Sequence, residues 1–166
     1  MNSNIYIPQA GPLRNIVDTI WHVKGSPSFR TEHIIPKGVV ELIFDLGGSN
    51  TMHALIGNKR QQLPRCFING FNTIPVQLHL PDEQDYFGVK FHPGVIKHLL
   101  GLPPGELVNQ MIDLTLVNDF FNTLWHQLAE ATDFNQRVNI ISNWLQSGHI
   151  NRSRQEELVD HFLLNP

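Results

Sequence analysis

Two acidic side chains interrupt an otherwise apolar stretch, IIPKGVVELIFDLGG, at residues 35–49. Successive side chains of a strand point to opposite faces, so Glu41 and Asp45 share one face. That face also carries Val39 and Ile43, whereas the opposite face is wholly apolar, with Val40, Leu42, Phe44 and Leu46. The carboxylate of Glu41 could accept hydrogen bonds in a polar pocket, or it could lie in solvent on an outer face. The pattern leaves both interpretations open.

The nine histidines raise the question of a metal site, because imidazole is the commonest metal ligand. None of the spacings HxH, HxxxH or HExxH occurs, and GxSxG, the Walker lysine loop and GxGxxG are also absent. The histidines of the predicted strands are scattered, one to a strand: His22, His33, His53, His79 and His92. We therefore predict no metal site, no cofactor and no catalytic residue.

The single cysteine, Cys66, lies in an apolar stretch and is predicted to be a small buried residue rather than a reactive thiolate. One cysteine excludes an internal disulfide, and the start MNSNIYIPQAGPLRN has no basic head followed by an apolar signal core. No apolar run approaches the roughly 20 residues that span a bilayer. These features predict a soluble, cytoplasmic protein without membrane contact.

The distribution of charge argues against contact with nucleic acid. The net charge is -3, and residues 106–166 hold three basic residues against eight acidic ones. Binding to duplex DNA requires lysine and arginine side chains grouped against the phosphates. We therefore expect that this chain does not contact nucleic acid itself.

The chain changes in character near residue 105, since eleven of the twelve glycines and ten of the eleven prolines lie at or before Gly105. Short strand candidates recur about every ten residues before that point. They are residues 17–24, 29–35, 39–46, 51–57, 65–69, 76–80 and 85–92. We predict an α+β protein in which an antiparallel β-barrel or sandwich precedes a small helical subdomain. Leu42 and Phe44 are predicted to be fully buried in a central strand.

Helical spacing of apolar residues follows Pro93. It predicts a helix from residue 95 that ends at Gly101, a second over 116–131, and a third that Asp133 caps. The segment that begins at Leu13 fits helical spacing as far as Trp21, while Thr19, Trp21 and Val23 fit a strand, and we predict a short helical entry that runs into a strand. The predicted organisation is a single domain with a β-rich part (1–92), a helical part (93–150), and a terminal helix or linker (151–166) with Ser153 and Glu156 as a capping box.

Four stretches carry a resemblance to a known family: GPLRNIVDTIWHV, IIPKGVVELIFDLGG, FINGFNTIPVQLHLP and FGVKFHPGVIKHLLGLPPGELVNQMIDL. Together they resemble the N-terminal domain of one branch of AraC-type transcriptional regulators. The shared pattern is Pro-x-Gly before Glu-Leu-Ile-Phe, a glycine inside a mid-chain strand (Gly70), and Gly-Val-x-Phe-x-Pro-Gly entering a helix. A later helix with Arg137 also resembles the family, so the likeness covers about residues 8–150.

The resemblance implies a cupin-like sensor or dimerisation domain that binds a small-molecule effector and catalyses no reaction. Such regulators continue with two helix-turn-helix units, and this sequence ends roughly where the first would begin. We therefore expect an attached or partner DNA-binding domain and a homodimer. The candidate ligand-binding residues are Trp21, His33, Glu41, Asn69 and Phe91. The candidate partners of the Glu41 carboxylate are His22, His33, Asn69, Lys90 and His92.

Two other functions remain open at this level. A small metal-dependent enzyme of the cupin type would need three convergent histidine or carboxylate ligands and an open coordination position. A pure dimerisation module would have a filled barrel without a cavity, and an apolar helical surface. The presence or absence of a pocket beside Glu41 is the observation that separates them best from a ligand-binding domain.

Overall fold

Two antiparallel sheets form the core of the fold in the computed structural model, which describes residues 1–48, 52–101 and 103–147. The six-stranded sheet has the order β1 (Asn2–Tyr6), β2 (Val17–Gly25), β9 (Gln84–Phe91), β4 (Val40–Asp45), β7 (Cys66–Asn69) and β10 (Met111–Asp113). The four-stranded sheet has the order β3 (Thr31–Ile34), β8 (Val76–His79), β5 (His53–Ile56) and β6 (Lys59–Gln62). In the described ranges no strand pairing joins the two sheets, so they do not close into a barrel.

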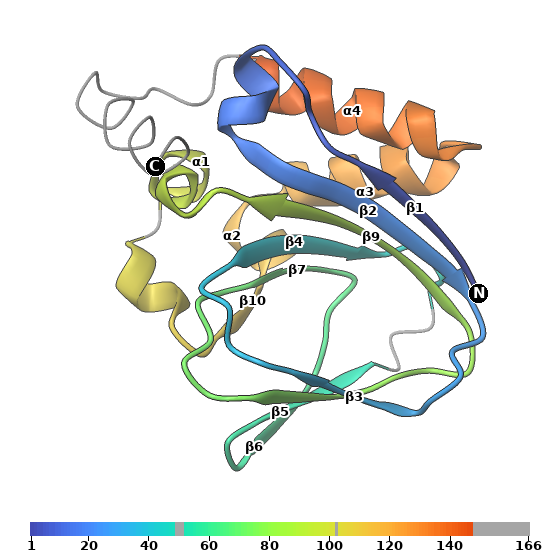
Figure 1. The fold of residues 1–166 in the computed structure, drawn as a ribbon, viewed down its shortest axis with the longest axis vertical. Helices are drawn as coiled ribbons and strands as arrows, with labels where there is room; N and C mark the ends of the chain where they lie inside the picture. The colour runs from blue at the N-terminus through green and yellow to red at the C-terminus, as the bar shows by residue number, and fades with distance from the viewer. Residues whose placement is uncertain (49–51, 102, 148–166) are drawn as a thin grey trace.

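The sheets face each other, and helices cover the far side of the larger one (Figure 1). The helical elements are η1 (Pro12–Asn15), η2 (Pro93–Val95), α1 (Ile96–Leu100), η3 (Pro104–Leu107), α2 (Leu114–Val117), α3 (Phe120–Glu130) and α4 (Phe134–Gln146). The α+β class predicted from the sequence is confirmed. None of the helices in the described residues is long and apolar enough to cross a membrane.

Strand β4 lies at the centre of the six-stranded sheet, between β9 and β7. Leu42 and Phe44 are 1% and 0% exposed, which confirms the predicted burial. They pack with α3 and α4 in a cluster that includes Leu124, Leu128 and Ile141. The opposite face of the same sheet contributes to a second, smaller cluster with residues of the four-stranded sheet.

The sequence prediction missed three strands. β1 is exposed along its whole length and β6 reads KRQQ, so neither shows the apolar alternation of a half-buried strand. β10 contains three residues and pairs with the edge of β7. The segment 93–150, predicted to be helical, therefore contributes one strand to the sheet.

Local capping explains where the helices begin and end. Gly101 adopts a left-handed conformation (φ 66°) and its N–H donates to Lys97, which ends α1 as predicted. The carboxylate of Asp133 accepts from the N–H of Gln136 at 2.9 Å and starts α4, also as predicted. The predicted helix over 116–131 is two helices, because Asn118 is extended and its side chain caps Phe120. The predicted terminal helix with Ser153 and Glu156 lies outside the described residues.

Candidate functional site

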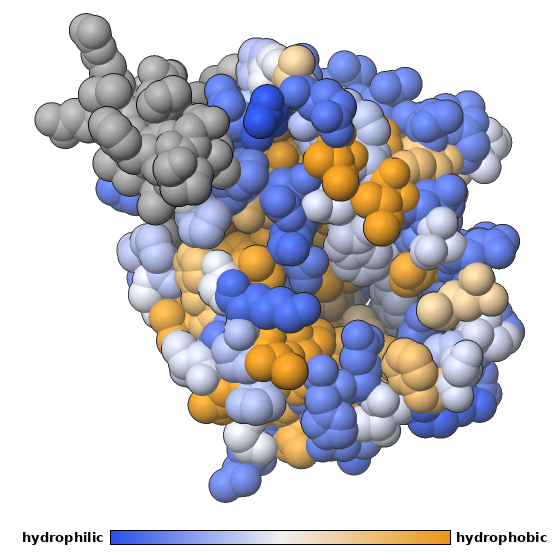
Figure 2. All heavy atoms as spheres, in the orientation of Figure 1, coloured by the Kyte–Doolittle hydropathy of each residue, from blue (hydrophilic) through white to orange (hydrophobic). Residues whose placement is uncertain are grey.

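A pocket of about 390 Å³ lies between the two sheets, on the face of the six-stranded sheet that the helices leave open. We call it the inter-sheet pocket. Its apolar wall includes Trp21, Val23, Ile34, Ile43, Leu78 and Leu80. Its charged residues are Glu32, Lys37, Glu41 and Lys90, and its neutral polar residues are Asn69, Asn72, Gln84 and Tyr86. Figure 2 shows a hollow on this side of the molecule, between the two sheets, with hydrophobic and hydrophilic residues around its opening.

Strand register places Glu41 in the middle of the pocket wall. On the six-stranded sheet Glu41 lies opposite Lys90 of β9 and opposite Asn69 of β7. Val40, Leu42 and Phe44 alternate with it and point to the other face, into the main core. The face of β4 that the sequence left ambiguous is therefore a pocket wall.

The indole of Trp21 lies across β9 at Gly88 and reaches Glu41. Trp21 pairs with Gly88 in the strand register, and a Cβ at Gly88 would stand 2.2 Å from the indole carbons Cε2 and Cζ2. Only glycine leaves room for a ring in that position. The side chain of Trp21 lies near enough to Glu41, two strands away from its own backbone, for hydrogen bonding that lowers the pKa of that carboxyl. Gly88 is thus a condition for the contact between Trp21 and Glu41.

Burial raises the pKa of the Glu41 carboxyl above its ordinary value, because the charged form loses water. The positive charge of Lys90, the hydrogen bond from Trp21 and the positive charge of Lys37 oppose this increase, and Glu32 adds to it. The ammonium of Lys90 lies 3.3 Å from the carboxylate of Asp18. Lys90 is therefore held by another partner while it faces Glu41 across the strands.

Two buried polar atoms of the pocket wall lack a hydrogen-bond partner in the part of the chain that the structure describes. They are the hydroxyl of Tyr86 and Oδ1 of Asn72, on side chains 4% and 9% exposed. Nδ2 of Asn72 donates to Oδ1 of Asn69 at 2.8 Å, so only its acceptor is left over. Burial, with a further contribution from Asp45, raises the pKa of Tyr86, which keeps its phenol protonated. Unmet buried groups are uncommon and call for an explanation.

Three of the five candidate residues, Trp21, Glu41 and Asn69, line the inter-sheet pocket. His33 and Phe91 do not. His33 alternates with the pocket residues Glu32 and Ile34 on β3, and it is exposed on the outer face of the smaller sheet. Phe91 is buried on the helix-facing side of β9.

The candidate partners of Glu41 also divide. Lys90 and Asn69 flank it in the strand register, whereas three histidines point elsewhere. His22 contacts Asp85, Nε2 of His92 lies 2.9 Å from the carbonyl of Arg14, and His33 is on the outer face. The alternation of β2 explains the first of these, because His22 follows Trp21 directly.

Sequence reasoning missed Tyr86, Asn72 and the indole donor of Trp21. Tyr86 could have been found, because it shares one face of β9 with Gly88 and Lys90, opposite to Phe87 and Val89. Asn72 lies in a loop after β7, where no periodicity applies. The hydrogen bond from Trp21 depends on the strand order β2-β9-β4, which is not a local property of the chain.

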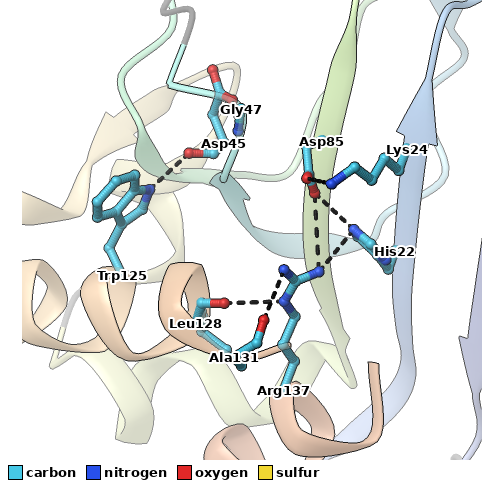
Figure 3. A network of polar contacts seen from close by, with 9 residues as sticks. All are labelled: His22, Lys24, Asp45, Gly47, Asp85, Trp125, Leu128, Ala131 and Arg137. Carbon is cyan, nitrogen blue, oxygen red and sulfur yellow. Dashed lines mark hydrogen bonds and ion pairs between the residues drawn. The ribbon is translucent and has the colours of Figure 1, made fainter. Parts of the chain in front are cut away.

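A second polar cluster ties the helices to the far face of the sheet (Figure 3). Nε2 of His22 lies 2.8 Å from the carboxylate of Asp85 and 3.0 Å from Nη1 of Arg137. Arg137 also donates to the carbonyls of Leu128 and Ala131, at the end of α3. Burial alone would raise the pKa of Asp85, but hydrogen bonds from Lys24 and His22 outweigh it and lower that pKa.

We call the cluster of His22, Asp85 and Arg137 the clasp, because it holds the helices against the sheet. Each of its members has a protein partner, and Arg137 satisfies helix-end carbonyls that would otherwise be unpaired. Trp125 makes a similar link, since its indole donates to the carbonyl of Asp45 at 2.7 Å. These contacts fix α3 and α4 on the sheet whose other face lines the inter-sheet pocket.

The thiol of Cys66 is buried, and burial raises its pKa, which disfavours the reactive thiolate. In the ranges 1–48, 52–101 and 103–147, no three His, Cys, Asp or Glu side chains are grouped so that they could hold a metal ion. A separate open groove between α3 and α4 is lined in part by Phe120, Leu124, Ile140 and Trp144. It lies on the helical side of the molecule, away from Glu41.

The fold and the pocket define an α+β domain with a mixed polar and apolar pocket between two antiparallel sheets. The chain belongs to the family described as "Domain of unknown function (DUF6597)", which matches residues 5–113. The match spans strands β2 to β10 and the end of β1, and therefore every residue of the inter-sheet pocket except Met1. Neither the curated proteins nor the solved structures contain a match to the chain.

Proposed function

We propose that this protein is the ligand-binding regulatory domain of an AraC-type transcriptional regulator, active in the cytoplasm. It binds a small-molecule effector in the inter-sheet pocket and catalyses no reaction. Ligand binding changes the position of an attached or partner helix-turn-helix domain. That domain contacts DNA, and this one does not. The observation that carries the proposal is the pocket itself, with the partly buried Glu41 in its wall.

The size and lining of the pocket support binding of a small molecule. Known sites of this kind are clefts of about 300–1,000 Å³ with mostly apolar walls and a few convergent polar groups. The inter-sheet pocket has about 390 Å³, an apolar wall, and the polar groups of Glu41, Tyr86 and Asn72. A pure dimerisation module gives no reason for an unfilled space between the sheets.

The residues behind the resemblance to AraC-type regulators support the same proposal. Glu41 belongs to the Glu-Leu-Ile-Phe stretch, and Gly88 belongs to the Gly-Val-x-Phe stretch. Glu41 forms the polar centre of the pocket wall, and Gly88 makes room for the indole that reaches it. Two facing antiparallel sheets around a pocket also agree with a cupin-like sandwich, which is the fold relationship that we propose.

A ligand screen with a pocket-filling variant tests the proposal. We expect compounds that raise the melting temperature of the wild-type protein to have no effect on Leu78→Trp, whose larger side chain occupies the pocket. Gln77→Trp is the matched control, because the neighbouring residue on β8 points to the opposite face. Equal stabilisation of wild type and Leu78→Trp by every active compound would contradict the proposal.

The regulatory part has a separate readout. Helices α3 and α4 pack on the sheet whose other face lines the pocket, so ligand binding is expected to slow hydrogen exchange in Leu124–Leu128 and Val138–Ile141. Exchange that slows in the pocket strands alone would indicate a passive binder. The homodimer remains a prediction, and light scattering of the purified protein measures it directly.

A further inference from the structure

We propose that the ligand of the inter-sheet pocket is an organic cation: an amine whose ammonium group binds the Glu41 carboxylate and whose flat apolar body lies against Trp21. This inference rests on the proposed function and names the class of its ligand. Three features of the pocket lead to it: the unmet capacity of Glu41, the unpartnered buried atoms, and the free face of the indole.

The Glu41 carboxylate has room for further donors. An ionised carboxylate offers two oxygens with about four acceptor positions. In the described part of the chain, the indole of Trp21 is its hydrogen-bond donor, while Lys90 and Lys37 act on it only through their charge. Lys90 is paired with Asp18 at 3.3 Å, and Lys37 is exposed at the mouth of the pocket. A partly buried carboxylate without a contacting cation favours a ligand that brings one.

The two unpartnered atoms belong to residues that line the pocket, although each atom itself has almost no accessible surface. Oδ1 of Asn72 is an acceptor, and the hydroxyl of Tyr86 can accept as well as donate. An ammonium group presents three donors and no acceptor, so it matches the open acceptor positions of the Glu41 carboxylate. A ligand carboxylate would face repulsion from Glu41 and Glu32 and would leave the acceptor of Asn72 unmet. Lys37 and Lys90 also line the pocket, so the charges of the lining residues balance, and it is the open acceptor positions of Glu41 that favour a cation.

Trp21 supplies a surface for the rest of the ligand. One face of its ring lies on the backbone of Gly88, and the residue also lines the pocket. A ring that the sheet covers on one side offers its other side to the pocket, where it can stack on a flat group or hold a cation. Leu78 and Leu80 of the opposite wall are apolar. At the roughly 30 Å³ that a water molecule occupies in the liquid, 390 Å³ corresponds to about a dozen waters, which is room for a small organic molecule.

Matched sets of compounds test this class directly. Each set has one apolar body that bears an amine, an alcohol or a carboxylate, for example tryptamine, tryptophol and indole-3-acetate, with phenyl and naphthyl sets beside it. We expect an amine to bind most tightly within its set by calorimetry, and its affinity to rise as Glu41 loses its proton. Glu41→Gln is expected to weaken that amine by about tenfold or more, because a charged contact is lost.

Two further variants separate charge from folding. Glu106→Gln, an exposed change outside the pocket, is expected to leave amine affinity unchanged. Tyr86→Phe removes one unpartnered hydroxyl and is expected to weaken the amine by a smaller factor. The melting temperatures of the ligand-free variants show whether each has folded.

The outcomes distinguish this inference from the proposed function. Tighter binding of the alcohol or the carboxylate, or amine affinity that survives Glu41→Gln, overturns the cation while a loss of binding in Leu78→Trp still supports the pocket. No binding by any amine also overturns the cation. If no compound of the broader screen is lost in Leu78→Trp either, the proposed function fails with it.

Discussion

The two faces of the six-stranded sheet differ in whether their buried polar groups have hydrogen-bond partners. On the helix-facing side, Arg137, His22 and Asp85 contact one another or the ends of α3, and each finds a partner within the chain. On the pocket side, the hydroxyl of Tyr86 and Oδ1 of Asn72 find none among the described residues. Strand β9 supplies both Asp85 and Tyr86, one to each face, so the difference lies in what covers each face.

This contrast separates stability from binding. A face covered by helices is fixed once the chain folds, and its buried polar groups are matched at that moment. A face that borders a pocket can keep unmet groups, at a cost in stability, when a ligand later completes them. Substitutions on the helix-facing side should therefore affect folding most, and those on the pocket side should affect binding most.

The largest expected effect is the loss of a core aromatic ring on the helix-facing side. Phe44→Ala should lower the free energy of unfolding by about 3–5 kcal/mol, because Phe44 is 0% exposed and its removal leaves a cavity. Phe29→Ala is the control, since Phe29 is 49% exposed, and it should change little. Urea unfolding of the two variants measures both values. A small effect at Phe44 would show that the sheet and helices are not packed as described.

The clasp at Arg137 gives the next largest effect. Arg137→Met keeps much of the side-chain volume but leaves the carbonyls of Leu128 and Ala131 without donors, and it removes a cation beside Asp85. We expect a loss of about 2–4 kcal/mol in the free energy of unfolding. Arg14→Met, at an exposed site, is the control. Similar unfolding midpoints for the two variants would remove the clasp from the account of the fold.

Gly88→Ala should disturb the pocket side. A Cβ at this position would stand 2.2 Å from the indole of Trp21, so the ring must move and its hydrogen bond to Glu41 is lost. We expect a loss of about 1–3 kcal/mol. The double variant Gly88→Ala, Trp21→Val should be more stable than the sum of the two single losses predicts, since the clash is gone. Additive losses would show that the two residues do not interact.

Tyr86→Phe should stabilise the ligand-free protein by up to about 1 kcal/mol, because it removes a buried hydroxyl without a partner. The same change should weaken ligand binding. Urea unfolding and calorimetry of one preparation measure both effects. A destabilised Tyr86→Phe would mean that the hydroxyl already has a partner, and the contrast between the two faces would fail there.

Much of the fold follows from local patterns in the sequence. The apolar alternation of 39–46, 76–80 and 85–92 identifies β4, β8 and β9, and the caps at Gly101 and Asp133 fix two helix boundaries. Strands without that alternation could not be found, because β1 and β6 are polar and largely exposed. The break between α2 and α3 depends on the side chain of Asn118, which competes with the helix for backbone hydrogen bonds.

The candidate site was only partly predictable. Alternation placed Glu41 opposite the core, and the resemblance drew attention to Gly88. His33 and Phe91 were chosen without knowledge of the strand order, and they lie on faces that do not meet the pocket. Which faces enclose a cavity depends on how two sheets pack, and that is a property of long-range pairing rather than of local spacing.

The smallest expected effect is on how the free energy of unfolding changes with pH. The pKa of Glu41 in the folded protein is raised above its ordinary value of 4.5, chiefly by burial. A carboxyl with a raised pKa gives stability that is fully present below its unfolded value and is lost as the pH rises through its folded value. The unfolding free energy of the wild-type protein should therefore contain a decline that begins near pH 4.5.

Glu41→Gln, which cannot titrate, should lack that part of the decline, whereas Glu106→Gln should keep it. Unfolding measured at closely spaced pH values for the three proteins gives the comparison. Parallel curves for wild type and Glu41→Gln would contradict a raised pKa for Glu41, because its burial would then be fully offset by Lys90, Trp21 and Lys37.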